Sequence, residues 1–275
     1  MSYSTLMVHL TLGTSNAALL RIAADLARKF DASLIGIAAC QPMPMVYGDG
    51  YMPAEIFEQD REIIGKDMKV AEAEFRGAFE SATRPLSWRT TVTTAGLADF
   101  LVREARSADL IITGVASDGP ADSARAVNTG DLIMQAGRPV LVVPASTETL
   151  QLERVLVGWK DSRETRRAIS DALPLLKKAA HVTVAQIAAE QDMDAARAHV
   201  EDVVGWLKRH GIAAQATTMP STGDDATGLH NVAQDLGADL IVAGAYGHSR
   251  LREWALGGVT RDFLLHADRC SLLSH

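Results

Sequence analysis

Cysteine is scarce in this sequence, and no stretch of apolar residues is long. The 275 residues include 2 Cys, Cys40 and Cys270, which stand in different halves of the chain and form no CxxC pair. Such spacing indicates neither a metal site nor a disulfide, and two buried free thiols in a reducing compartment are expected. No apolar run approaches the roughly 18–20 residues that a membrane-spanning helix needs, so we expect no membrane association.

The sequence also lacks an excess of basic residues. Lys and Arg number 27 against 34 Asp and Glu, which gives a net charge of −7. Nucleic acid or an acidic membrane is therefore not expected as a general partner, although one small anion in a local loop is compatible with this balance. The N-terminal segment MSYSTLMVHLTLG has no basic region followed by a long apolar core, so no signal peptide is predicted and a cytoplasmic location is expected.

Familiar catalytic motifs are absent as well. The sequence contains no GxSxG, no HExxH and no Walker A pattern with its Lys. His199 and His210 share a predicted helix, but three turns separate them by roughly 16 Å, which is too far to hold one metal ion. We therefore assign no catalytic residue and no metal ligand, and we expect any ATP hydrolysis to be slow.

A duplication is the main feature that the sequence does contain. Residues 108–114 (ADLIITG) match residues 238–244 (ADLIVAG), and residues 32–38 correspond to residues 182–188. The period is too long for a solenoid and suits a duplicated domain. A chain of this length can form two domains with a core in each, and we predict them at residues 1–147 and 152–275.

Strands alternate with helices in both predicted domains. In the first, periodicity predicts strands at 6–12, 34–38, 88–94, 110–113 and 140–143 and helices at 16–30, 54–82, 96–107 and 124–135. In the second, it predicts strands at 155–159, 182–187, 213–218, 240–243 and 271–274 and helices at 163–179, 193–210, 227–236 and 260–267. This alternation predicts two doubly wound α/β units with parallel sheets and right-handed crossovers.

The most informative stretch is residues 238–260, ADLIVAGAYGHSRLREWALGGVT. A short buried strand ends at Gly244, a basic turn follows, and the pair Gly257-Gly258 precedes a predicted helix. Glycines after a strand let the backbone approach a ligand closely, and free N–H groups at a helix N-terminus bind anions. The stretch therefore predicts a phosphate-binding loop, with a simple tight turn before a helix as the alternative.

This loop, Gly-x2-Gly-x9-Gly followed by Val259-Thr260, resembles the nucleotide loop of the universal stress protein family. The resemblance extends over nearly the whole chain, as two copies in tandem. It implies two five-stranded Rossmann-like domains of the adenine nucleotide alpha hydrolase-like type, with strand order 3-2-1-4-5. It also implies an intrachain pseudo-dimer, in which the edge strands at 140–143 and 271–274 cover one another. Further homodimer formation by whole chains stays open.

The resemblance implies a nucleotide site in the second domain, with ATP as the expected ligand and Mg²⁺ bound through its phosphates. The expected site residues are the end of the first strand, a base-packing residue and the glycine loop: Gly158, Trp159, Lys160, Ile187, Ala243, Gly244, Gly247, His248, Gly257, Gly258, Val259 and Thr260. Ile187 is explained as well by an ordinary core role, and His248 by a solvated surface loop.

Two positions of the second domain depart from the family pattern. Gly258 stands where the family has Ser or Thr, although Thr260 offers a hydroxyl two residues on. Lys160 stands where the family has an Asp that accepts from the adenine amino group. An ammonium has donors only, so either Asp161 serves instead or the base is not adenine.

The corresponding loop of the first domain lacks the glycines. Ser117 stands in place of Gly247, and Ala126-Val127 stand in place of the glycine pair. Asp118 and Asp122 would repel a polyphosphate. We therefore predict a degenerate pocket in the first domain, which then acts as a scaffold.

The predicted function is that of a universal stress protein that binds a small-molecule nucleotide and acts as a stress sensor or regulator with unidentified protein partners. The alternative is a stress scaffold without nucleotide, in which the glycines only form turns. A nucleotidyl-transferring enzyme ranks last, because residues 158–162 (GWKDS) supply no glycine-rich anion loop after the first strand.

Overall fold

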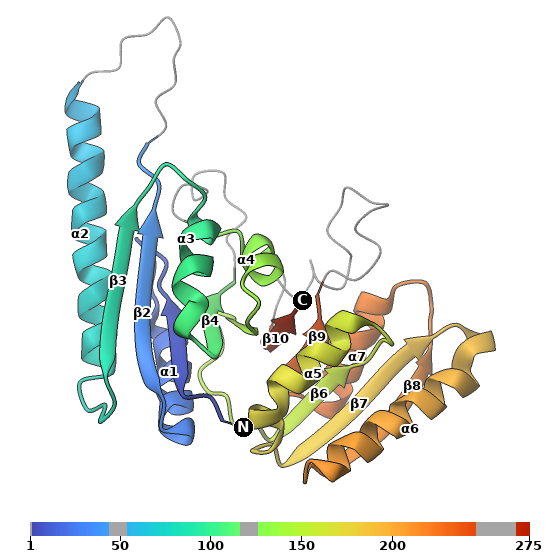
Figure 1. The fold of residues 1–275 in the computed structure, drawn as a ribbon. Coiled ribbons are helices and arrows are strands. Elements are labelled where there is room, and N and C mark those ends of the chain that lie inside the picture. The colour runs from blue at the N-terminus through green and yellow to red at the C-terminus, as the bar shows by residue number, and fades with distance from the viewer. Residues whose placement is uncertain (1, 44–53, 116–125, 246–267) are drawn as a thin grey trace, which may run out of the picture.

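The computed structural model describes residues 2–43, 54–115, 126–245 and 268–275 (Figure 1). The first half of the chain contains β1 Thr5–His9, α1 Ala17–Phe30, β2 Ser33–Cys40, α2 Ala54–Ala78, β3 Leu86–Val92, α3 Leu97–Glu104, the 3-10 turn η1 Ala105–Ser107, β4 Leu110–Gly114, α4 Thr129–Gln135 and β5 Val140–Val143. The second half contains β6 Arg154–Gly158, α5 Arg163–Leu176, β7 His181–Ala188, η2 Glu190–Asp192, α6 Met193–Arg209, β8 Ala214–Pro220, α7 Asp225–Leu236, β9 Leu240–Gly244 and β10 Cys270–Ser274.

The described strands form one sheet in the order β3-β2-β1-β4-β5-β10-β9-β6-β7-β8. Within each half the neighbours are parallel, as in the pairing of β1 with β2 and β4 and of β6 with β7 and β9. The strand order therefore reverses direction between β1 and β4 in the first half and between β6 and β9 in the second. These are the two positions at which a doubly wound sheet binds ligands.

The two halves join through β5 and β10, which pair antiparallel. Their register places Leu141 opposite Leu272, flanked by Val142 opposite Ser271 and Val140 opposite Leu273. Both strands are buried along their length, so neither presents an open edge. The predicted intrachain pairing of the two halves is thus confirmed.

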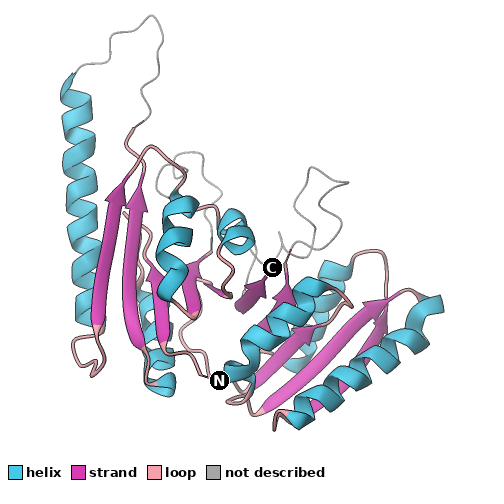
Figure 2. Cartoon of the chain, in the orientation of Figure 1, coloured by secondary structure: helices cyan, strands magenta, loops and turns pink. Residues whose placement is uncertain are grey.

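Helices cover both faces of the sheet (Figure 2). One continuous core cluster joins residues of α1, α2, α5 and α6 to strand residues of both halves, for example Leu26, Phe75, Ile169 and Val200. A second cluster on the other face joins α3, α4 and α7 to the same strands. Because the first cluster runs across β5 and β10, the two halves share one core.

Several predicted boundaries move in the structure. The helix predicted at 124–135 begins only at Thr129, where the Asn128 side chain accepts a hydrogen bond of 3.0 Å from the Asp131 backbone N–H and caps the helix. The helix predicted from residue 227 begins at Asp225, because Asp224 caps it in the same way. The helix predicted at 260–267 lies outside the described residues.

Cys40 and Cys270 are both buried, as predicted, and they form no disulfide with each other. Burial raises the pKa of the Cys270 thiol to about 12, so this thiol is not a reactive thiolate at neutral pH. Of the helices in the described parts of the chain, none has the length and apolar character needed to cross a membrane.

Candidate functional site

The rim of the second half is formed by the carboxyl ends of β6 and β9. The register pairs Gly158 with Ala243 across these strands, and Gly244 is the last residue of β9. The structure therefore brings three of the predicted site residues together at one edge of the sheet. Lys160 follows two residues after β6 and is exposed to solvent.

Gly244 lies directly beneath the first turn of α5. A Cβ atom at this position would stand 2.5 Å from the Thr165 backbone nitrogen and 2.6 Å from the Glu164 carbonyl carbon. Real Cβ contacts are never so short, so only glycine lets the helix approach the strand at this point. The sequence argument attributed Gly244 to the approach of a ligand, and the structure gives it a role in helix packing.

The N-terminus of α5 already holds a negative group of the chain itself. The side chain of Glu164 is buried, and its carboxylate lies 3.3 Å from the Arg163 guanidinium. Burial alone would raise the pKa of this carboxyl. Hydrogen bonds from its own backbone N–H and the Ser162 hydroxyl, together with the charges of Arg163 and His275, outweigh that effect and lower the pKa. The chain's own carboxylate therefore lies at the positive end of α5.

Trp159 and Ile187 lie on opposite faces of the sheet. Trp159 is buried in the core cluster under α5 and α6, whereas Ile187 packs on the other cluster, under α7. A Cβ atom at Gly228 of α7 would stand 2.7 Å from Ile187 Cδ1, which fits the core role considered for Ile187. The structure does not bring these two predicted site residues together.

Six of the predicted site residues lie outside the described residues: Gly247, His248, Gly257, Gly258, Val259 and Thr260. Ser117, Asp118 and Asp122 of the first half also lie outside them. In the described parts of the chain, no group of three or more His, Cys, Asp or Glu side chains is arranged to hold a metal ion.

The rim of the first half contains a cavity of about 220 Å³ at the carboxyl ends of β1 and β4. Gly114 corresponds to Gly244, but no atom of the described residues lies within 4 Å of a Cβ built on Gly114. This difference between Gly114 and Gly244 comes from the length of the connection between the first strand and the first helix of each half. Seven residues, 10–16, separate β1 from α1, whereas only four, 159–162, separate β6 from α5. The longer connection leaves α1 away from Gly114, and space remains.

His9 is the main functional candidate that sequence reasoning missed. It lies beside Thr113, and the two side chains are joined by a hydrogen bond of 2.9 Å between Nδ1 and Oγ1. The His9 side chain is buried, and its Nε2 has no partner among the described residues. Burial lowers the pKa of His9 to about 4, so the ring is neutral at pH 7. The available signal in the sequence was a polar residue in each of two mostly apolar strands, His9 in β1 and Thr113 in β4.

Among the described residues, the lining of this cavity carries no charge at neutral pH. Besides His9, it consists of Thr, Ser, Asn, Gly, Ala, Leu and Val residues, including Asn16 and Thr129. Such a lining offers hydroxyls and apolar surface but no cation for a phosphate. The described residues thus form a cavity at this rim, and a first half unsuited to polyphosphate stays a prediction.

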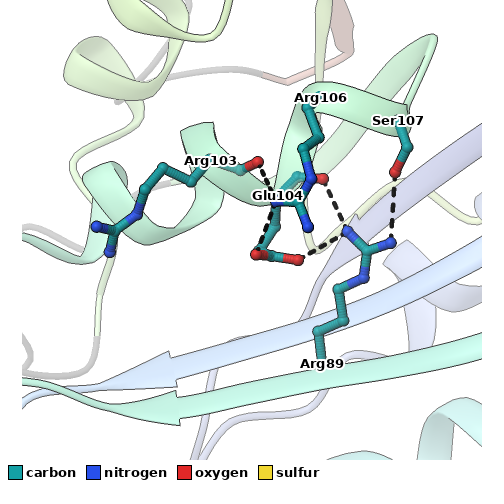
Figure 3. Close-up of polar contacts among 5 residues, drawn as sticks. All are labelled: Arg89, Arg103, Glu104, Arg106 and Ser107. Carbon is teal, nitrogen blue, oxygen red and sulfur yellow. Dashed lines mark hydrogen bonds and ion pairs between the residues drawn. The ribbon is translucent and has the colours of Figure 1, made fainter.

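A charged cluster at the far end of α3 is structural rather than part of either rim (Figure 3). Glu104 pairs with Arg89 of β3 at 2.8 Å and with Arg106 at 3.0 Å, and Arg89 also donates to Ser107 Oγ. Burial tends to raise the pKa of Glu104, but the hydrogen bonds and charges of Arg106 and Arg89 outweigh it and lower the pKa. The cluster fastens the end of α3 to β3.

Comparisons with known proteins agree with this architecture. Residues 151–273 match the sequence model of the universal stress protein family. A universal stress protein from Archaeoglobus fulgidus DSM 4304 is similar over 98% of this chain and 97% of its own, with 12% identity and a TM-score of 0.73. A protein of unknown function from Pseudomonas aeruginosa PAO1 is similar over 99% and 92%, with 14% identity and a TM-score of 0.59. These two structures show a shared fold. No curated protein matches the sequence.

Proposed function

We propose that the protein acts in a cytoplasmic stress response by binding a nucleotide, because residues 151–273 match the sequence model of the universal stress protein family. The proposed ligand is ATP, with Mg²⁺ held through the phosphates. The proposed site lies in the second of two domains, at residues 152–275, and the first domain, at residues 1–147, acts as a scaffold. No residue is assigned a catalytic role.

The observation that carries this proposal is the position of the glycine loop. The stretch with Gly247, Gly257 and Gly258 directly follows β9, and β9 borders the point where the strand order reverses. Ligands of doubly wound sheets bind at such points. A glycine-rich stretch of the sequence therefore follows the strand that borders the expected ligand position.

The described surroundings narrow down where the phosphates would bind. The buried carboxylate of Glu164 lies at the N-terminus of α5. We therefore expect the phosphates to bind the backbone of residues 247–260 rather than the N-terminus of α5. Lys160 is exposed near the same rim and adds a positive charge. Gly158, Ala243 and Gly244 would form the floor, with His248 and Thr260 as polar contacts.

One observation favours the scaffold alternative. Gly244 is fully explained by its contact with α5, so one of the four glycines needs no ligand to account for it. Lys160 and Gly258 point the same way, because neither can make the contact that the family residue makes. In this alternative the protein acts through partner proteins without a bound nucleotide.

Calorimetric titration separates the two functions. One sample of the full-length protein is denatured and precipitated, and the supernatant is analysed for nucleotide that the purified protein retained. A second sample of folded, nucleotide-free protein is then titrated with ATP, ADP and AMP in the presence of Mg²⁺. We expect ATP to bind with a Kd below about 0.1 mM, equivalent to about −5.5 kcal/mol. Absence of heat with all three nucleotides, and of retained nucleotide, would support the scaffold.

A pair of matched variants tests the location. Gly247→Val should abolish binding, because a branched side chain blocks the backbone from the phosphates. Gly114→Val in the first half is the control, since no described atom lies within 4 Å of a Cβ at this position, and the variant should leave the affinity unchanged. If Gly114→Val abolishes binding and Gly247→Val does not, the nucleotide site lies in the first half.

A further inference from the structure

The outward side of α2 carries apolar side chains that the described chain leaves uncovered. Figure 1 shows this 25-residue helix at the outer edge of the first half, beside β3. Its inward residues, such as Ile64 and Phe75, are buried in the core. Ile63 and Val70, in contrast, are 49% and 50% exposed. They stand seven residues apart, a spacing that places side chains on one side of a helix.

A shallow hollow lies on the same side of α2, and its lining has the spacing of a helix-binding surface. Six residues line it: Glu62, Gly65, Lys66, Lys69, Val70 and Ala73. They form two successive sets at positions i, i+3, i+4 and i+7, and four residues so spaced form the hole that receives one side chain of a facing helix. No described atom lies within 4 Å of a Cβ built on Gly65. Contacts of the described chain therefore do not account for a glycine inside this helix, where glycine is unfavourable.

Charged residues run beside the apolar ones at the same seven-residue spacing. Four exposed residues form this series: Glu55, Glu62, Lys69 and Arg76. Among the described residues, Arg76 pairs with Glu72 of its own helix at 2.7 Å, and the other three make no ion pair. This side of α2 is therefore acidic toward the N-terminus of the helix and basic toward its C-terminus.

We propose that two copies of this chain form a symmetric dimer through the outward side of α2, with the two helices antiparallel. Ile63 of each copy packs beside Val70 of the second copy, and both contacts occur twice, as in any twofold interface. The aliphatic stem of Lys66 lies over Gly65 of the second copy, which leaves the ammonium in water. The dimer covers the exposed apolar side chains and fills the hollow.

The charge series selects the direction of the two helices. A twofold axis near residue 66 places Glu62 opposite Lys69 of the second copy and Glu55 opposite Arg76 of the second copy, so every charge in the series faces one of opposite sign. Parallel helices would instead place each charge opposite its own duplicate, which is unfavourable. The series is therefore complementary to itself only in the antiparallel arrangement.

The expected dimer is weak. A contact limited to one helix from each copy belongs at the low end of protein interface sizes, so we expect a Kd of about 1–100 μM. No nucleotide takes part in the contact, and the dimer does not depend on the proposed function.

Analytical ultracentrifugation of the full-length protein tests the dimer. Over about 1–300 μM, a range that brackets the expected Kd, the weight-average mass should rise from 29.4 kDa toward twice that value. Ile63→Gln should weaken self-association by about tenfold or more, because an exposed apolar contact is lost on both sides of the axis. Circular dichroism at low concentration establishes that each variant is folded.

Charge reversal tests the antiparallel register. Glu62→Lys and Lys69→Glu should each weaken self-association by about tenfold, because each places like charges opposite one another. The two variants mixed together should associate more tightly than either alone, since every pair is then of opposite sign. Glu201→Lys, the same change on an exposed residue of α6, is the control and should have no effect.

Three results would overturn the proposal. The first is a wild-type protein that stays monomeric throughout the concentration range. The second is a dimer that Glu62→Lys and Glu201→Lys weaken equally, which would show that the copies meet elsewhere. The third is a mixture of Glu62→Lys and Lys69→Glu that associates no more tightly than the separate variants, which would exclude the antiparallel register.

Discussion

Gly244 at the end of β9 lies against the backbone of Thr165 in α5, where a Cβ atom would stand 2.5 Å from the Thr165 nitrogen. The equivalent residue of the first half, Gly114, has no described atom within 4 Å of a Cβ built at its position. The two halves of a duplicated chain therefore use the same glycine differently. In the second half this glycine lets α5 pack closely on the strand, and in the first half it borders a cavity.

This difference predicts opposite tolerance to a methyl group. Gly244→Ala should destabilise the protein by about 1–3 kcal/mol, because α5 must shift to accommodate the new atom. Gly114→Ala should change stability by less than about 0.5 kcal/mol. Urea unfolding of both variants measures the difference, and equal losses would contradict the contact between β9 and α5.

The buried His9 should make stability depend on pH. Its folded pKa of about 4 lies below the unfolded value of about 6.5, so the unfolded state binds the proton first as the pH falls. The contribution of His9 to stability is therefore complete above about pH 6.5 and decreases until about pH 4, by roughly 3 kcal/mol in total.

The His9→Leu variant isolates this contribution. The free energy of unfolding of the variant should lack the His9 term, so the difference between wild type and variant should change by roughly 3 kcal/mol between pH 7 and pH 4. Chemical denaturation at several pH values measures it. A difference that is constant over this range would show that His9 titrates alike in both states.

Glu104 should stabilise the protein through its two arginine partners. Its side chain is 18% exposed and that of Arg89 is 25% exposed, so Glu104→Gln should lower the free energy of unfolding by about 1 kcal/mol at pH 7. The lowered pKa means that this contribution is present above the unfolded pKa of about 4.3 and is lost as the pH falls below it. Glu80→Gln, on an exposed residue, is the control, and a loss as large there would argue against the cluster.

The pairing of β5 with β10 should couple the two halves. Leu272→Ala removes a fully buried side chain opposite Leu141 and should destabilise by about 2–5 kcal/mol. Amide hydrogen exchange should then speed up in β5, which belongs to the other half. Leu207→Ala is the control, since Leu207 is equally buried but lies on α6. Equal acceleration of β5 in both variants would show that the effect is not local.

Much of the architecture follows from local pattern. Apolar periodicity located the strands and most helices to within a few residues, since each element must bury one face. Boundaries shifted where a cap competed with periodicity, as at Asn128, whose side chain begins α4 at Thr129 rather than at 124. The repeat of ADLI in both halves predicted the duplication, and the resemblance to the universal stress protein family implied the mutual pairing of the edge strands.

The candidate site could be predicted only in part. The glycines after β9 stand out in the sequence because bare backbone has few other uses in such numbers. The cavity above Gly114 has no such signal, because it results from three additional residues in the connection before α1. Trp159 Nε1 and His9 Nε2 lack hydrogen-bond partners among the described residues. This can be recognised only when the positions of the neighbouring donors and acceptors are known.

The sequence by itself determined the class of fold, the duplication, the buried thiols and the series of glycines after β9, because these depend on residue type and on spacing along the chain. Only the tertiary structure decided that α5 covers Gly244, that Trp159 and Ile187 face opposite sides of the sheet, and that the first half keeps a neutral cavity. Those outcomes depend on how closely segments distant in sequence approach one another, which the length of a loop and the packing of a helix determine together.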